Sequence, residues 1–168
     1  MAAGTLAQAA AEAEQLSASG SERELASLRA QWDEELEAAA RSADFRERAV
    51  AYRAIGQFRY RQKLELLRRG LEDESPAARG SALLSLELLS RDGPAPVNAD
   101  RSLLHTLATS DPNAVVRRLA ILNLKNGSPQ RDTIVILEGI AEDDEQPREL
   151  RDAAKRVAGL LTKKSRAR

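Results

Sequence analysis

Apolar residues along this chain recur at intervals of three and four, which is the spacing of one face of an α-helix. The spacing from Leu25 through Trp32 to Leu36 predicts a helix over about residues 22–41, and the same pattern returns in later segments. The run 134–137 has strand propensity when it is taken alone. Its place in the recurring pattern nevertheless predicts a helix. The pattern as a whole therefore predicts an all-α protein.

Prolines and glycines divide the apolar pattern into separate helices. Pro76 and Pro147 each suit the first turn of a new helix and disfavour continuation of the helix before it. Glycine-containing or proline-containing segments predict breaks at 56–60, 93–96 and 126–129. We therefore expect helices joined by short connectors.

The two ends of the chain are expected to differ from the part between them. Residues 1–20 are rich in alanine and carry only a thin apolar stripe, which predicts a weak helix or a tail. Ser21 and Glu24 then form a capping-box pattern that opens the next helix. We expect one helical domain over 21–163, followed by a basic, frayed tail over 164–168.

One pattern recurs near the start of every second predicted helix. It has an acid six residues before an arginine, and a small residue three after that arginine. The copies are Asp73…Arg79…Ala82, Asp111…Arg117…Ala120 and Glu145…Arg151…Ala154, with a degenerate first copy at Arg48 and Ala51. The copies recur every 34 to 38 residues. Repeats of this length with two helices each are typical of solenoids, in which neighbouring units stack to bury their apolar faces.

This arrangement resembles the HEAT-repeat family, and more closely the short bacterial HEAT-like repeats that are also found in phycobilisome lyase-type proteins. The resemblance covers about residues 22–163 and implies a right-handed α-solenoid of about four helical hairpins. It also implies a ladder of buried hydrogen bonds between successive units. The ladder would contain Asp73, Arg79, Asp111 and Arg117, with Arg151 joining through Glu145 or Asp144. Carboxylates near helix N-termini are favourable, and arginine can bridge to them with two parallel bonds.

The composition and motifs indicate no catalytic chemistry. Without cysteine the chain has no thiolate nucleophile, and its single histidine, His105, lies on an apolar helical segment where a packed side chain is typical. The acidic cluster 142–145 lacks the pattern of a calcium loop, and no glycine-rich phosphate motif is present. We therefore expect no enzyme, metal or cofactor. The sequence has neither a secretory signal nor a membrane-spanning run, so we expect a soluble cytoplasmic protein.

Charge is balanced overall, with 26 basic and 26 acidic residues, but it is unevenly distributed. Residues 1–40 hold eight acids against two arginines, and residues 41–69 hold nine bases against three acids. Within the basic region, arginine and tyrosine alternate in a way that suits an anionic surface. These candidate partner-binding residues are Tyr52, Arg53, Arg59, Tyr60, Arg61 and Lys63. The alternative is that Phe58 packs inward and the arginines pair with the acids of 33–37.

A second candidate surface consists of three leucines. Leu84, Leu88 and Leu122 fall beside or outside the inward stripe of their helices. Second helices line the concave side in HEAT-like stacks, so by this resemblance the leucines would form an apolar groove there. The alternative is that they widen the core.

Three functions are consistent with this sequence. The first is a non-enzymatic adaptor that binds another protein. The second is nucleic-acid binding through 41–69, whose signature would be affinity that falls steeply with salt. The third, which follows the lyase-type resemblance, is assistance in attaching a bilin to another protein; an aromatic content of 3% offers little for a bilin pocket.

Overall fold

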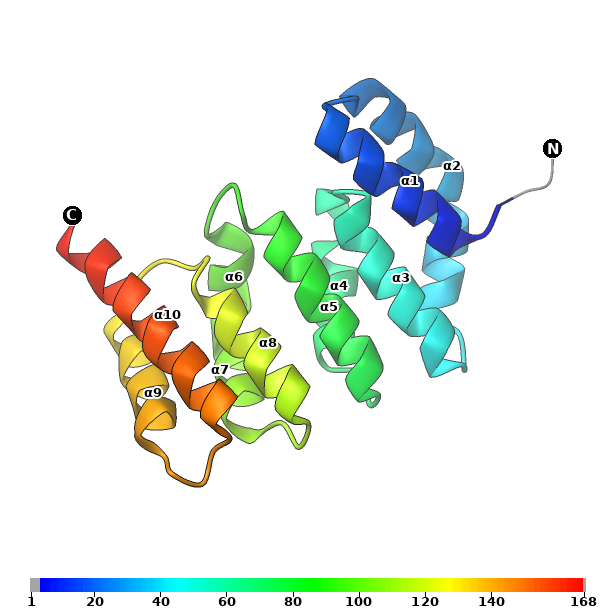
Figure 1. Cartoon of the computed structure of the whole chain (residues 1–168). Helices are drawn as coiled ribbons and strands as arrows, with labels where there is room; N and C mark the ends of the chain where they lie inside the picture. The colour runs from blue at the N-terminus through cyan, green and yellow to red at the C-terminus, as the bar shows by residue number, and fades with distance from the viewer. Residues whose placement is uncertain (1–3, 168) are drawn as a thin grey trace. The chain divides into compact units, whose positions relative to one another are not determined.

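A computed structural model of the protein describes residues 4–167, and within them the chain forms ten α-helices, one 3-10 turn and no strand (Figure 1). The helices are α1 (Leu6–Ser19), α2 (Glu22–Ala40), α3 (Phe45–Gln57), α4 (Leu64–Leu71), α5 (Pro76–Leu89), α6 (Ala95–Ala99), α7 (Arg101–Ser110), α8 (Ala114–Leu124), α9 (Arg131–Glu142) and α10 (Arg148–Arg166), with the 3-10 turn η1 at Arg61–Lys63. The all-α prediction is confirmed, and the run 134–137 lies in α9.

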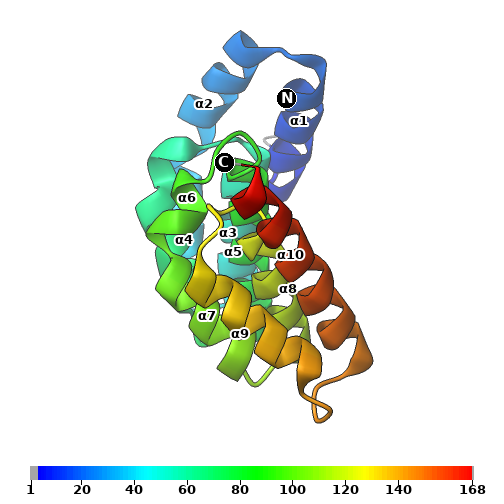
Figure 2. The same cartoon turned by 90° about the vertical axis from the view of Figure 1, so that its left-hand side faces the viewer.

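The chain divides into two compact units, with the boundary between Leu89 and Ser90. The first unit contains the hairpins α2–α3 and α4–α5, and the second contains α7–α8 and α9–α10. Within each unit the second helix of one hairpin packs on the second helix of the next: α3 on α5, and α8 on α10. Figure 2 shows this for the second unit, where α8 and α10 lie on one side and α7 and α9 on the other. These are the four hairpins expected from the repeat.

A close approach of α3 to α5 joins the hairpins of the first unit. The Gly56 N–H donates to the Ser85 hydroxyl at 2.9 Å, in addition to its place in the helix. That hydroxyl donates in turn to the carbonyl of Arg53 at 2.9 Å. A Cβ on Gly56 would lie only 2.6 Å from the Ser85 Cα, so a larger residue at 56 would force the helices apart. The packing of these helices therefore depends on glycine at this position.

The N-terminal segment is more ordered than its thin apolar stripe predicts. Thr5 caps α1, because its hydroxyl accepts from the Gln8 N–H at 3.2 Å and the Gln8 side chain accepts from the Thr5 N–H at 2.8 Å. The helix ends at Gly20, whose φ of 77° is left-handed. The buried face consists of Ala9, Ala10 and Ala13, and it packs on α2 and α3. Small side chains allow this close packing, so α1 belongs to the first unit.

The second unit has a polar cluster between α7 and α9. Arg101 is buried and donates to the hydroxyl of Thr133 at 3.0 Å and to the side chain of Asn98. His105 Nε2 lies 2.8 Å from the same hydroxyl, so the histidine is packed, as expected. The last helix of the second unit, α10, continues to Arg166, whereas the helical domain was expected to end at 163.

Candidate functional site

The arginine of each repeat folds back onto the loop that precedes its helix. It is the fourth residue of α3, α5, α8 and α10. Arg48 donates to the carbonyl of Ser42 (3.0 Å), Arg79 to that of Asp73 (2.9 Å), Arg117 to that of Asp111 (2.7 Å) and Arg151 to that of Gln146 (3.1 Å). The recurring arginine therefore fastens the loop of its own hairpin.

One rung of the expected ladder is present in the first unit. Arg48 donates to both carboxylate oxygens of Asp73, at 2.8 Å from Nε and 3.0 Å from Nη2, and the two side chains are 12% and 7% exposed. Burial alone would raise the pKa of Asp73. The hydrogen bonds from Arg48 and from the Ser75 N–H outweigh burial and hold the pKa below its ordinary value. The rung therefore uses the arginine of the degenerate first copy.

The third copy departs from the expected pairing. The side chain of Asp143 accepts the N–H two residues on, at 3.0 Å, in the same way as the aspartates of the two preceding copies (both 2.9 Å). Asp143 is thus the equivalent acid, although it precedes Arg151 by eight residues because this loop is longer. Glu145 is exposed, and the Arg151 side chain binds the carbonyl of Gln146. The predicted pairing of Arg151 with Glu145 or Asp144 is corrected accordingly.

The basic stretch predicted to bind a partner is largely engaged within the first unit. Lys63 Nζ lies 2.8 Å from a carboxylate oxygen of Asp33 and 2.5 Å from one of Glu37. The Tyr60 hydroxyl donates to Asp33 at 2.6 Å. Hydrogen bonds from Lys63 and Tyr60 lower the pKa of Asp33. Burial works against the charge of Lys63, but its bonds to both carboxylates outweigh this and raise its pKa. This cluster joins α2 to the η1–α4 segment.

The remaining members of that stretch are also held by the fold. Arg59 has a left-handed backbone (φ 52°) and donates to the carbonyl of Gly56 at 2.5 Å, and Arg61 donates to the carbonyl of Leu89 at 3.0 Å. Tyr52 is only 3% exposed, and a Cβ on Gly70 would lie 2.8 Å from its ring. The side chain of Tyr52 therefore packs in the interior, and its assignment to a binding surface is corrected.

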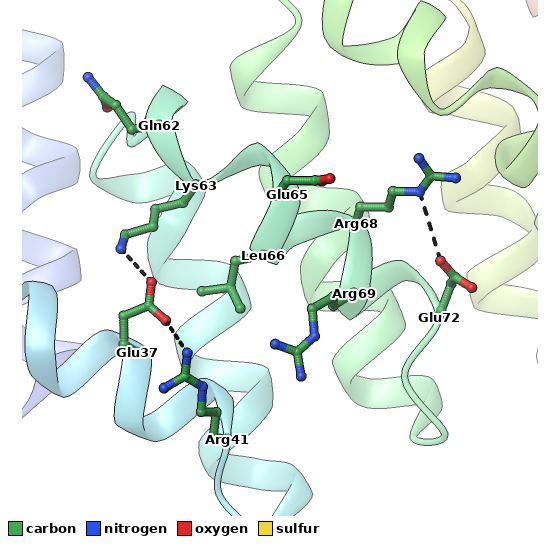
Figure 3. Close-up of a pocket in the computed structure, with 9 residues that line it drawn as sticks. All are labelled: Glu37, Arg41, Gln62, Lys63, Glu65, Leu66, Arg68, Arg69 and Glu72. Carbon is green, nitrogen blue, oxygen red and sulfur yellow. Dashed lines mark hydrogen bonds and ion pairs between the residues drawn. The ribbon is translucent and has the colours of Figure 1, made fainter.

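A charged hollow of about 640 Å³ lies beside this cluster (Figure 3). It is lined by Glu37, Arg41, Gln62, Lys63, Glu65, Leu66, Arg68, Arg69 and Glu72. Arg41 lies 3.4 Å from Glu37, and Arg68 lies 3.9 Å from Glu72. The hollow thus has interspersed charges of both signs that pair with one another, and exposed pairs of this kind contribute little to stability.

The second-helix faces carry the other predicted residues. Counted from the start of each helix, Arg53, Leu84 and Leu122 are all the ninth residue, on α3, α5 and α8. Leu88 follows Leu84 by one turn, and Leu160 holds the same thirteenth position on α10. The side chains of Leu84 and Leu160 are 40% and 43% exposed. Val115 of α8 precedes Leu122 by seven residues, or about two helical turns, so it lies on the same side of the helix. We call this side of the second helices, within each unit, the second-helix face.

Residues 33–125 match the family model for HEAT repeats. The chain belongs to the HEAT-repeat family. The match spans α3 to α8 with part of α2, and the α9–α10 hairpin repeats the same arginine-fastened loop beyond it. The comparison with curated proteins found no match. Within residues 4–167, no helix is both long and apolar enough to cross a membrane. HEAT repeats commonly serve as scaffolds for protein interaction.

The second-helix face of the first unit contains a small hollow between α1, α3 and α5. Its volume is about 320 Å³, and it is lined by Ala7, Ala49, Val50, Arg53, Gln57 and Ser81. Arg53 is a candidate from the sequence because it follows Tyr52 in the basic region. Its position on the second-helix face, nine residues into α3, is what places it beside the apolar positions.

Proposed function

We propose that this HEAT-repeat protein is a non-enzymatic adaptor that binds another protein through the second-helix face. The observation that carries the proposal is that the second helices of each unit carry exposed, large apolar side chains. Leu84 and Leu160 are examples, and Val115 near the start of α8 is 64% exposed. Complete burial of an exposed leucine contributes about 1.5–3 kcal/mol, so covering the exposed part of Leu84 contributes about 1 kcal/mol. Exposed apolar patches with polar surroundings are typical of interaction sites.

The charge arrangement supports protein binding over the two alternatives. Several bases of the 41–69 region are matched by carboxylates, among them Arg48 by Asp73 and Lys63 by Asp33. Such cations are less available to neutralise phosphates, so steep salt dependence is not expected of this surface. A bilin would need aromatic neighbours, and Tyr52 is buried.

The test is affinity capture from native lysate with the full chain as bait. Val115→Asp changes the second-helix face, whereas Val135→Asp changes a comparably exposed valine (57%) on the first helix α9. Leu84→Asp extends the test to the first unit. We expect one protein to be retained by wild type and by Val135→Asp, and to be lost with Val115→Asp or Leu84→Asp.

Lysate treated with nuclease separates the remaining outcomes. If Val115→Asp, Val135→Asp and Leu84→Asp all retain the partner at wild-type levels, binding through this face is refuted. Recovery of a partner only from lysate that has not been treated would favour the nucleic-acid alternative. Unchanged circular dichroism of each variant shows that the loss does not come from unfolding.

A further inference from the structure

The partly buried guanidinium of Arg53 has unused hydrogen-bond donors. Its Nη1 atom is buried and has no hydrogen-bond partner in the part of the chain that the structure describes. The nearest carboxylate oxygen, on Glu14 of α1, is 3.8 Å from Nη2, which is too long for a hydrogen bond. A guanidinium offers five N–H donors, and withdrawing them from water without acceptors is costly. The side chain is nevertheless only 31% exposed.

The neighbouring side chains explain why Arg53 stays unsatisfied. Gln57 donates to the other carboxylate oxygen of Glu14 at 3.3 Å, so Glu14 is shared between two donors. The arginines that begin the repeats differ, because Arg48 and Arg79 reach backbone carbonyls of their own loops. Arg53 lies five residues further along α3 than Arg48, and it has no such loop within reach.

The lining of the hollow carries no charge other than that of Arg53, and Glu14 lies beside Arg53 outside this lining. The other lining residues are the small or apolar Ala7, Ala49, Val50 and Ser81 and the polar Gln57. Val50 is partly exposed, and Leu84 follows Ser81 by one turn on α5, so apolar surface continues from the hollow. The site thus combines one incompletely bonded cation with adjoining apolar surface.

We propose that this hollow receives an amphipathic segment of the partner protein, in which one Asp or Glu carboxylate binds Arg53 and flanking apolar side chains cover Val50 and Leu84. This inference rests on the proposed adaptor function and names the chemistry of its ligand. A carboxylate matches the guanidinium in charge, and it can accept two parallel hydrogen bonds once the Arg53 side chain turns its buried Nη1 toward the hollow. A single cation in a hollow with an otherwise uncharged lining suits one acidic side chain better than the regular charges of a nucleic acid.

The experiment is selection of a random 16-residue peptide library displayed on phage against the full chain. We expect enriched peptides to contain an acidic residue flanked by apolar residues at helical spacing. Synthetic copies of these peptides should bind Arg53→Gln about tenfold or more weakly, as for a central charged anchor. Arg53→Lys keeps the charge without the fork and should be intermediate. Arg46→Gln is the matched control on α3, since Arg46 is exposed and pairs with Asp44, and it should leave affinity unchanged.

The peptide supplies the second half of the test. Changing its acidic residue to the amide should cost as much as Arg53→Gln, and the two changes together should cost little more than either one. Enriched peptides that require Leu84 but are insensitive to Arg53→Gln would overturn the carboxylate assignment and leave the adaptor function standing. Failure to enrich any peptide would overturn the inference that the hollow takes a short segment. The adaptor function would still be tested independently by the lysate capture with Val115→Asp.

Discussion

Replacing Gly56 by alanine adds one methyl group at the closest approach of α3 and α5. The new Cβ would lie 2.6 Å from Cα, 2.7 Å from Oγ and 2.8 Å from Cβ of Ser85. Carbon atoms that are not bonded prefer separations of about 3.5–4.0 Å, so the helices would have to move apart by about 1 Å. The Ser85 Cα is a backbone atom and cannot rotate away. The strain must therefore be relieved by a shift of a whole helix.

Two opposing effects set the size of the change. Overpacking of a well-packed contact costs about 1–3 kcal/mol, and a clash with backbone places Gly56→Ala near the upper end. Alanine in place of glycine within a helix contributes about 1 kcal/mol in the other direction. We expect the first unit to lose about 2 kcal/mol of unfolding free energy.

Urea unfolding followed by tryptophan fluorescence measures this change directly. Trp32 is the only tryptophan of the chain and lies in α2, so its emission reports on the first unit. The matched control is Gly139→Ala in α9, where a Cβ meets nothing within 4 Å. Followed by circular dichroism, this variant should gain about 0.5–1 kcal/mol. Stability of Gly56→Ala equal to or above wild type would refute the close α3–α5 contact.

Three further predictions concern the ionic contacts. Asp73→Asn leaves Arg48 without its countercharge and should cost about 3 kcal/mol in urea unfolding, whereas Asp143→Asn, at an exposed position, should change stability by less than about 0.5 kcal/mol. The pKa of Asp73 is lowered in the folded state, so its contribution to the free energy of unfolding is present above the ordinary pKa of 3.8 and is lost as the pH falls. When unfolding is measured at decreasing pH, Asp73→Asn should therefore lose less stability than wild type. The raised pKa of Lys63 contributes stability that is fully present below pH 10.5 and is lost at higher pH. Lys63→Met should therefore lose less stability than wild type at alkaline pH. An alkaline stability profile equal to that of wild type would contradict the Asp33–Lys63 contact.

The pattern of apolar residues was enough to predict the helices of the four hairpins, but not the short helix α6, which begins within the connector expected at 93–96. Helical periodicity is a local property, so the breaks at 56–60 and at Pro76 appear in the sequence as they do in the structure. The recurring arginine was also recognisable, because its partners are carbonyls of the loop six or fewer residues away. Such contacts require little knowledge of how distant helices pack.

Contacts between distant segments were decided by the tertiary structure. Tyr52 is buried because Gly70 leaves room above its ring, and Lys63 binds Asp33 and Glu37 because η1 is brought beside α2. Asp143 takes the place expected of Glu145 because the length of a loop determines which acid faces the helix start. The sequence by itself therefore determined a HEAT-like series of helical hairpins. Only packing decided which charged side chains have all their hydrogen bonds made within the fold and which, like Arg53, retain unused donors. Hydrogen bonds of this kind depend on distances between atoms that are far apart in the chain.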